Sequence, residues 1–329
     1  MITRRNLVIA FGASALAPFA SFAQQQGKVW RVGFLAYRHL DFADSDYNYG
    51  PFRQGLRELG YVEGTNLAIE WRSAEGKSEN LPALVAEMVR LKLDVLATAG
   101  TAASIAAQKA TTEIPIVMVN VGDPVGSGLV KSLARPGGNS TGVSNLGSDL
   151  GPKLLEMLRG MVPKVARVAV LVDPANRANL LLMQNVQAAA QKVGVKLQAV
   201  EASTPEGIAA GFAEMARQRA GALIVPTAAI FNQQKSQIAE LATKWRLPSI
   251  SVFGEYAEAG GLVSYGPNLR EIIRRSTVYV DKIIKGANPG DLPVEQPTTF
   301  ELVINLKTAK ALHIKIPNST LLQATKVIE

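Results

Sequence analysis

Buried-strand patterns alternate with amphipathic helix patterns along most of this chain, and the alternation restricts the fold more than any other feature. Short continuous apolar runs are typical of buried strands, and between them apolar residues recur at helical spacing. The series runs over residues 29–144 and starts again near residue 154. Alternation of this kind predicts parallel sheets covered by helices on both faces, and the restart predicts two α/β units.

The expected elements follow directly from these patterns. The predicted strands are residues 29–36, 66–72, 95–99, 114–119, 141–144, 167–172, 196–200, 222–225, 249–252 and 300–304. The predicted helices are residues 51–59, 81–91, 102–110, 125–134, 154–161, 180–193, 208–218, 234–244, 269–284 and 306–312. The last part of the chain does not continue the second series, so we expect it to re-enter both units. Crossovers near residues 144–147, 256–263 and 296–300 would join two interleaved lobes around a cleft that can hinge shut.

The N-terminal residues 1–23 have the layout of a secretory signal peptide. Arg4 and Arg5 precede an apolar run, and Ser21 and Ala23 provide the small residues of a cleavage site. The apolar run is too short to span a bilayer. We therefore expect export with cleavage after Ala23, by either the general secretory or the twin-arginine route. The absence of cysteine excludes a lipoprotein signal.

Residue types that are missing or rare exclude several kinds of site. Without cysteine there are no disulfides, thiolate metal sites or cysteine nucleophile. His39 and His313 are the only histidines, which excludes a metal site built from several histidines, and neither lies in a G-x-S-x-G hydrolase motif. No P-loop or G-x-G-x-x-G motif occurs, and we expect no cofactor.

The charge of the chain is moderately basic. Without residues 1–23 it carries 33 basic and 27 acidic residues, a formal charge of +6, and the basic residues are dispersed. A dispersed charge is typical of a solvated surface rather than of a nucleic-acid site, so no nucleic-acid partner is expected. The same charge favours anionic ligands through long-range steering.

Candidate ligand-binding residues in the first unit lie at the carboxyl ends of strands, where ligands of open parallel sheets bind. They are Tyr37, Gly100, Thr101, Ala102, Asp123, Ser144 and Asn145. Residues 100–103 start a helix, and their free amides and the helix dipole are expected to bind a carboxylate. Asp123 either caps the following helix or binds a ligand ammonium or hydroxyl.

Equivalent strand ends in the second unit provide the remaining candidates. They are Asp173, Asn176, Thr227, Phe253, Glu255 and Tyr265. Glu255 is the alternative to Asp123 as the partner of an ammonium group. Aromatic residues near these loops are expected to enclose a planar or branched ligand. These aromatic residues are Tyr37, Phe231, Phe253 and Tyr265.

Several sequence blocks make a family resemblance recognisable. The chain reads FRQGLRELGYVEG at residues 52–64, DPV at 123–125, RPGGNSTGVS at 135–144, GGLVSYG at 260–266 and FELVINLKTA at 300–309. These blocks resemble segments of the ABC-transporter substrate-binding proteins, a bacterial family that includes tryptophan- and tyrosine-binding periplasmic members. The resemblance extends over essentially the whole chain after the signal peptide.

The resemblance implies a type I periplasmic-binding fold, with two Rossmann-like lobes and three hinge crossovers. On this basis residues 24–144 plus 262–296 form the N-terminal lobe, and residues 145–261 plus 297–329 form the C-terminal lobe. It also implies a periplasmic monomer that delivers its ligand to an inner-membrane permease driven by a cytoplasmic ATPase. The ligand is expected to be a small carboxylate-bearing solute, either an aromatic or branched amino acid or an aromatic acid.

Three other functions remain open on the sequence. A periplasmic sensor would use the same fold to present its ligand to a membrane receptor. An exported α/β hydrolase would depend on His39 or His313. A transcriptional regulator of this fold is disfavoured by the export signal and by the lack of an N-terminal helix-turn-helix.

Overall fold

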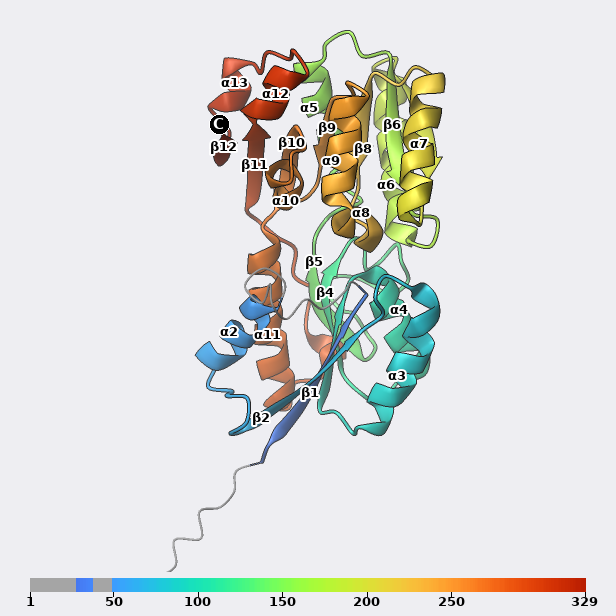
Figure 1. The fold of residues 1–329 in the computed structure, drawn as a ribbon. Coiled ribbons are helices and arrows are strands. Elements are labelled where there is room, and N and C mark those ends of the chain that lie inside the picture. Colours follow the sequence, from blue (N-terminus) through green and yellow to red (C-terminus); the bar gives the residue numbers. More distant parts are fainter. Residues whose placement is uncertain (1–27, 38–48) are drawn as a thin grey trace, which may run out of the picture.

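The described chain forms two α/β lobes stacked end to end (Figure 1). This computed structural model describes residues 28–37 and 49–329. The expected signal peptide and His39 lie outside the described residues. The predicted fold class, α/β with parallel strands in two lobes, is confirmed.

The N-terminal lobe contains a five-stranded parallel sheet in the order β2-β1-β3-β4-β5. Its strands are β1 (Trp30–Ala36), β2 (Leu67–Ser73), β3 (Val95–Ala99), β4 (Ile116–Val121) and β5 (Ser140–Ser144). Helices α2 (Gly50–Glu58) and α11 (Leu269–Ile284) cover one face, and α3 (Leu81–Arg90) and α4 (Thr101–Ala110) cover the other (Figure 1). Two short 3₁₀ helices are η1 (Ser78–Asn80) and η2 (Pro289–Asp291).

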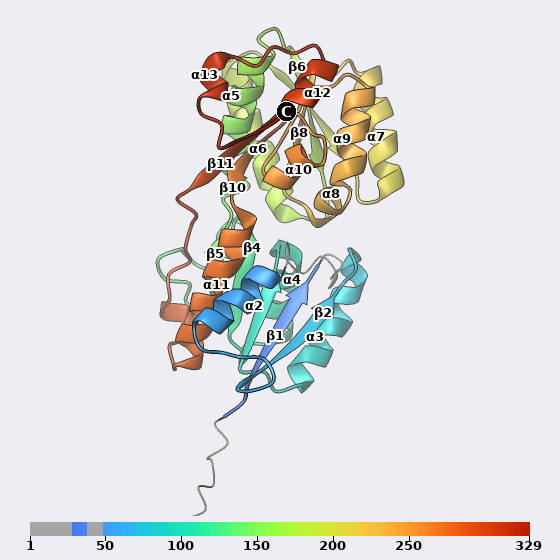
Figure 2. The same ribbon diagram turned by 60° about the vertical axis from the view of Figure 1, so that its left-hand side comes forward.

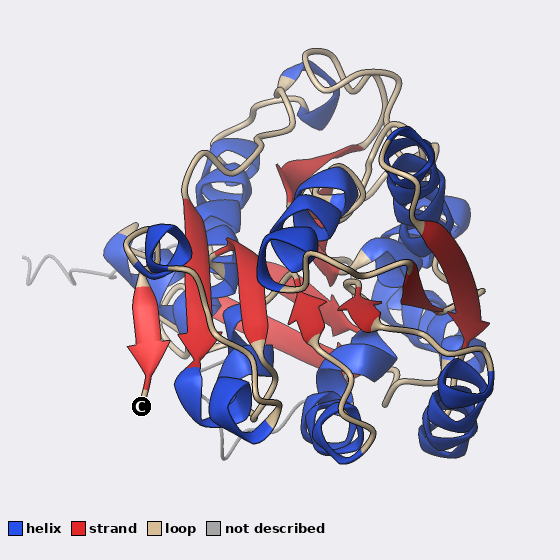
Figure 3. Cartoon of the chain, turned by 90° about the horizontal axis from the view of Figure 1, so that it is seen from above, coloured by secondary structure: helices blue, strands red, loops and turns tan. Residues whose placement is uncertain are grey.

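The C-terminal lobe contains a seven-stranded sheet in the order β12-β11-β10-β9-β8-β6-β7. Its strands are β6 (Arg167–Val172), β7 (Lys196–Glu201), β8 (Ala222–Val225), β9 (Ser249–Ser251), β10 (Val263–Pro267), β11 (Phe300–Asn305) and β12 (Lys326–Ile328). Only the β10–β11 pair is antiparallel. The helices are α5 (Gly151–Met161), α6 (Arg177–Lys192), α7 (Pro205–Arg217), α8 (Ala229–Gln233), α9 (Lys235–Lys244), α10 (Gly254–Glu258), α12 (Leu306–Ala311) and α13 (Asn318–Leu321). Seen from above, the strands lie between helices (Figure 3).

Apolar side chains on both faces of each sheet explain why the strands read as continuous apolar runs. Phe34 and Phe52 are fully buried in the N-terminal lobe, and Phe212 and Ile238 are fully buried in the C-terminal lobe. Each large apolar side chain that folding removes from water stabilises the fold by about 1.5–3 kcal/mol. Among the described residues, no helix is long and apolar enough to cross a membrane.

Three crossovers connect the lobes on one side of the molecule (Figure 2). They follow β5, connect β10 to α11, and precede β11. The predicted boundary at residue 262 is wrong, because residues 263–267 pair with β9 and β11 of the C-terminal sheet. The second crossover therefore lies at Asn268, whose side chain caps α11 by accepting a hydrogen bond from the Glu271 amide.

The helix predicted over residues 125–134 is wrong as well. The segment after β4 is a series of turns. Gly128 has a φ of +76°, a left-handed conformation that ends helical geometry, and Asp123 Oδ1 accepts a hydrogen bond from the Gly126 amide at 2.8 Å. Asp123 therefore stabilises a tight turn instead of capping a helix.

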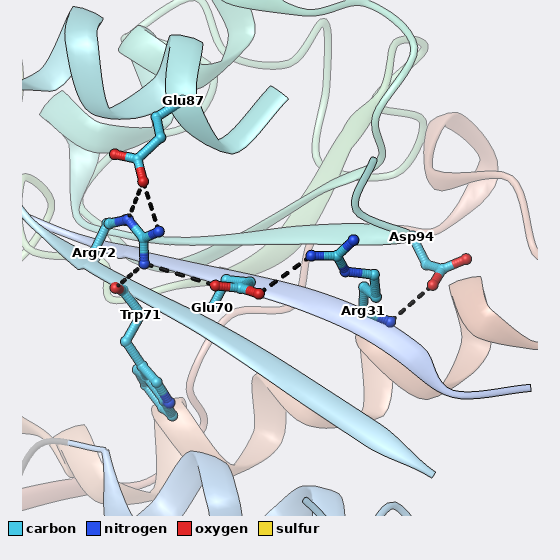
Figure 4. Close-up of polar contacts among 6 residues, drawn as sticks. All are labelled: Arg31, Glu70, Trp71, Arg72, Glu87 and Asp94. Carbon is cyan, nitrogen blue, oxygen red and sulfur yellow. Dashed lines mark hydrogen bonds and ion pairs between the residues drawn. The ribbon is translucent and has the colours of Figure 1, made fainter. Parts of the chain in front are cut away.

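Charged side chains cover strand β2, which is an edge of the N-terminal sheet (Figure 4). Arg72 forms an ion pair with Glu87 of α3, and Glu70 forms one with Arg31 of β1. Charges on an edge strand disfavour pairing with a strand of another chain. This cluster lies on β1, β2 and α3, and none of these charged residues lines the cavity described next.

Candidate functional site

A cavity lies between the two lobes, at the carboxyl ends of strands from both sheets. Its volume is about 810 Å³, including space open to solvent. Nine of the predicted residues line it: Tyr37, Gly100, Thr101, Ala102, Asn145, Asp173, Asn176, Thr227 and Phe253. The topology thus brings loops of both lobes to a single site.

The N-terminal lobe contributes the start of α4 to this cavity. Gly100 has a φ of +94°, and in the part of the chain that the structure describes no atom lies within 4 Å of the position that a side chain would take there. The first hydrogen bond of the helix is donated by the Ser104 amide to the Gly100 carbonyl, so the amides of residues 101–103 have no acceptor within the helix. The first turn contains no acidic residue, and these amides form a site that favours an anion.

Aromatic side chains form a second part of the same wall. Phe34 packs edge-on against Tyr49, with ring centroids 5.0 Å apart, and both residues line the cavity. The Tyr37 hydroxyl lies 3.1 Å from Ser78 Oγ. Burial raises the pKa of Tyr37, so its phenol stays neutral and able to donate a hydrogen bond. Phe253 adds an apolar surface from the other lobe.

The C-terminal lobe contributes Asp173, which directly follows β6 and is only 5% exposed. Its Oδ1 accepts a hydrogen bond from the Ala175 amide at 3.1 Å. Burial raises the pKa of Asp173, and the Ala175 hydrogen bond opposes that shift. Among the described residues that line the cavity, Asp173 is the only acid and there is no Lys, Arg or His. A buried carboxylate without a cationic neighbour favours a cation from outside the protein.

Amide side chains hold the Asp173 loop in place. Asn179 Oδ1 accepts a hydrogen bond from the Asp173 amide at 3.1 Å, and Asn179 Nδ2 donates to the Thr227 carbonyl at 2.8 Å. Asn176 Nδ2 donates to the same carbonyl, while its Oδ1 caps α6. The loops after β6 and β8 are therefore fixed relative to each other, and Asp173 is held with them.

The remaining predicted residues lie outside the cavity. Asp123 is part of the turn after β4, and Ser144 Oγ accepts a hydrogen bond from the Leu146 amide. Glu255 is in the first turn of α10. Tyr265 stacks on Phe300, with centroids 5.8 Å apart, because β10 is paired with β11 rather than ending at the cavity.

Two further expectations about the site also fail. Phe231 is 1% exposed and belongs to the core of the C-terminal lobe, so it does not enclose a ligand. His313 is exposed in the turn after α12, away from the cavity. No group of three or more His, Asp or Glu in the described part of the chain has a metal-binding arrangement.

Sequence reasoning missed other lining residues. They are Phe34, Ala36, Tyr49, Ser78, Ala99, Val119, Asn120, Gly122, Ala175, Ala228, Ala229, Asn232, Leu269 and Ile273. Asn120 was a detectable case, because it is the one polar residue within the apolar run of β4. It has a φ of +62°, and its Oδ1 accepts a 2.6 Å hydrogen bond from Asn145 Nδ2.

Comparison with known proteins identifies the family of this chain. Residues 42–328 match the ABC transporter substrate binding protein family. The chain belongs to this family. As a substrate-binding protein of ABC type, it is expected to use the interlobe cavity for its ligand.

Individual relatives of this substrate-binding protein agree with the family match. It is 26% identical to a tyrosine-binding protein of Clostridioides difficile, over 80% of this chain and 76% of the relative. A structure from Vibrio cholerae is 28% identical, has a TM-score of 0.86 and matches 91% of this chain and 100% of its own. An ABC domain from Streptococcus pneumonia in complex with L-Trp is 26% identical, with a TM-score of 0.83 and coverage of 91% and 99%.

Proposed function

We propose that this substrate-binding protein captures a free aromatic α-amino acid in the interlobe cavity. The ligand carboxylate binds the amides of residues 101–103, and the ligand ammonium binds Asp173. The observation that carries the proposal is the chemistry of Asp173, a buried carboxylate in the cavity with no cationic side chain among the described lining residues. A solute that carries an ammonium and a carboxylate on one carbon binds both walls of the cavity at once.

The aromatic lining supports an aromatic side chain on the ligand. Phe34, Tyr37 and Tyr49 lie on one side of the cavity and Phe253 on the other. Aromatic rings bury large areas against a planar ligand and add edge-to-face contacts. The tyrosine-binding relative and the relative in complex with L-Trp support the same class of ligand.

The family and the sequence support a cellular role for this proposal. The protein is exported by its N-terminal signal and acts in the periplasm as a monomer. It passes the amino acid to an inner-membrane permease, and a cytoplasmic ATPase drives import. The net charge of the chain without residues 1–23 is positive, so a site selective for a zwitterion depends on local groups rather than on the overall field.

Thermal unfolding of the exported form with a ligand panel tests the proposal. The panel contains L-tryptophan, L-tyrosine, L-leucine, indole-3-propionate, glucose and adenosine. A ligand at 100 times its Kd adds about 2.7 kcal/mol, which raises Tm by a few degrees. We expect the largest increase with L-tryptophan or L-tyrosine.

Indole-3-propionate is the matched control, because it is L-tryptophan without the amine. It should raise Tm less than L-tryptophan at equal concentration. Equal increases for the two compounds would contradict the role of Asp173, and no increase with either aromatic amino acid would contradict the proposed ligand class.

A further inference from the structure

Two glycines of the N-terminal lobe contact the first turns of α6 in the C-terminal lobe. A Cβ placed on Gly122 would lie 2.7 Å from the Ala178 Cβ, and one placed on Gly126 would lie 2.8 Å from Leu181 Cδ1. Ordinary contacts between carbon atoms are about 3.5–4.0 Å. The two lobes therefore approach more closely here than side chains on these glycines would allow.

The contact at Gly122 is coupled to both walls of the cavity. Gly122 lines the cavity on the side of β4, and its carbonyl accepts a hydrogen bond from Ser148 Oγ at 3.3 Å. The Ala178 amide donates to Asn176 Oδ1, and Asn176 lies in the loop that starts at Asp173. A displacement of the first turn of α6 from Gly122 therefore moves the Asp173 loop away from the N-terminal lobe.

The backbone at Gly122 does not itself require glycine. Its φ is outside the left-handed region, and apart from Ala178 the only atom of a described residue within 4 Å of the added Cβ is Asn145 Oδ1, at 3.8 Å. Among the described residues, alanine at this position would thus collide with the other lobe and with nothing in its own lobe. Gly126 is a poorer probe, because a Cβ there would also collide with the side chain of Asp123.

We propose that Gly122 is a positioning residue for ligand capture, at which the absence of a side chain sets how closely the two lobes close. The identity of the captured ligand rests on the proposed function, but the closure distance does not. With alanine at residue 122, α6 must stay roughly 1 Å farther away to restore an ordinary contact. Ligand groups that bridge the two walls then lose contact with one of them.

The experiment uses Gly122→Ala, Ala178→Gly and the double variant that combines them. Removal of the Ala178 methyl makes room for the methyl at residue 122, so the double variant should close like the wild-type protein. Gly160→Ala is the matched control, since no atom of residues 28–37 or 49–329 lies within 4 Å of the added methyl there. Spin labels on cysteines introduced at exposed Ala83 of α3 and Ala209 of α7 report the distance between the lobes, and the chain contains no other cysteine.

Double electron–electron resonance is recorded without ligand and with L-tryptophan or L-tyrosine. We expect Gly122→Ala to lose the shortest-distance component of the wild-type distribution, and the double variant to regain it. The affinity for the amino acid, measured by calorimetry, should fall at least about tenfold in Gly122→Ala, because apparent affinity scales with the closed fraction. It should return to within about threefold of the Ala178→Gly value in the double variant.

Three results would overturn the proposal. The first is an unchanged short-distance component in Gly122→Ala. The second is a double variant that stays as open as Gly122→Ala. The third is a wild-type distribution that L-tryptophan or L-tyrosine shortens without reaching the distance of this structure. Failure of the proposed ligand gives a different result, since neither amino acid would then alter the wild-type distances, while the ligand-free comparison still decides the role of Gly122.

Discussion

The two walls of the cavity recognise charge by different means. The N-terminal wall offers backbone amides at the start of α4 and has no charged side chain among its described lining residues. The C-terminal wall offers one buried carboxylate, Asp173, in a loop that the amide side chains of Asn176 and Asn179 hold in place. A site made of backbone groups resists removal by a single substitution, whereas a site made of one side chain does not. Binding should therefore be far more sensitive to mutation on the C-terminal wall.

The largest expected effect comes from Asp173→Asn, which keeps the shape and removes the charge. Loss of one partner of a buried ion pair costs about 3–5 kcal/mol, so affinity for L-tryptophan should fall at least about 100-fold in calorimetry. Affinity for indole-3-propionate should stay the same or increase, because this ligand has no ammonium. A variant that binds L-tryptophan within threefold of wild type would contradict the assignment of Asp173.

The same substitution should stabilise the ligand-free protein near neutral pH. Burial raises the pKa of Asp173, so the folded state binds this proton more tightly than the unfolded state. The stability linked to this group is present below its unfolded pKa and is lost as pH rises through the folded pKa. Asparagine avoids that loss, and the Tm of Asp173→Asn should exceed that of wild type at pH 7 without ligand.

A change in the ligand tests the N-terminal wall. L-tryptophanamide keeps the ammonium and the indole but lacks the carboxylate charge. A hydrogen bond to a charged group contributes about 1.5–3 kcal/mol, so affinity should fall about 10- to 100-fold. The ratio between L-tryptophan and its amide should be similar in Asp173→Asn, since the two walls bind different groups. Equal affinities for the two ligands in wild type would exclude the α4 amides as the carboxylate site.

Acid should weaken binding through the C-terminal wall alone. Only the charged form of Asp173 pairs with an ammonium, so Kd should rise about tenfold for each pH unit below its raised pKa. The fall in affinity should begin above pH 3.8, the ordinary value for this group. Calorimetry of L-tryptophan binding from pH 8 to pH 4 measures this, with Asp173→Asn as a control that should show no such dependence. A wild-type affinity that is constant over this range would contradict the prediction.

Much of the fold could be predicted from the sequence because buried parallel strands and amphipathic helices have strong local patterns. The strands Val95–Ala99, Arg167–Val172 and Ala222–Val225 and the helix Leu269–Ile284 agree with the predicted bounds at every residue. Strand β10 was missed because its sequence, VSYGP, contains glycine and proline and is stabilised by pairing with β9 and β11. That pairing is a tertiary interaction that no local pattern contains.

Lining residues of the cavity were predictable where they follow the ends of strands. They were not predictable where the direction of a side chain decides whether it reaches the cavity. Gly100 and Asp173 follow strands directly, Thr227 lies two residues after β8, and all three line the cavity as the topology requires. Asp123 also follows a strand, but glycines make its loop a tight turn in which its carboxylate accepts the Gly126 amide. Phe34 was not predicted as a lining residue, because a buried strand residue that also reaches a cavity has the same apolar pattern as one that does not.

The smallest expected effect comes from removing a charge outside the cavity. It tests whether ligand binding depends on groups within the cavity walls or on the overall field of the lobe. Glu87 accepts hydrogen bonds from Arg72 Nε and Nη2 at 2.9 and 2.6 Å, and this contact lowers the pKa of Glu87 (Figure 4). Both partners are partly exposed, and such pairs contribute at most about 1 kcal/mol, less in high salt. Glu87→Gln should therefore lower Tm by no more than a few degrees and change the affinity for L-tryptophan less than about twofold. A larger change in affinity would mean that the overall field of the N-terminal lobe, rather than the α4 amides, governs binding at its wall.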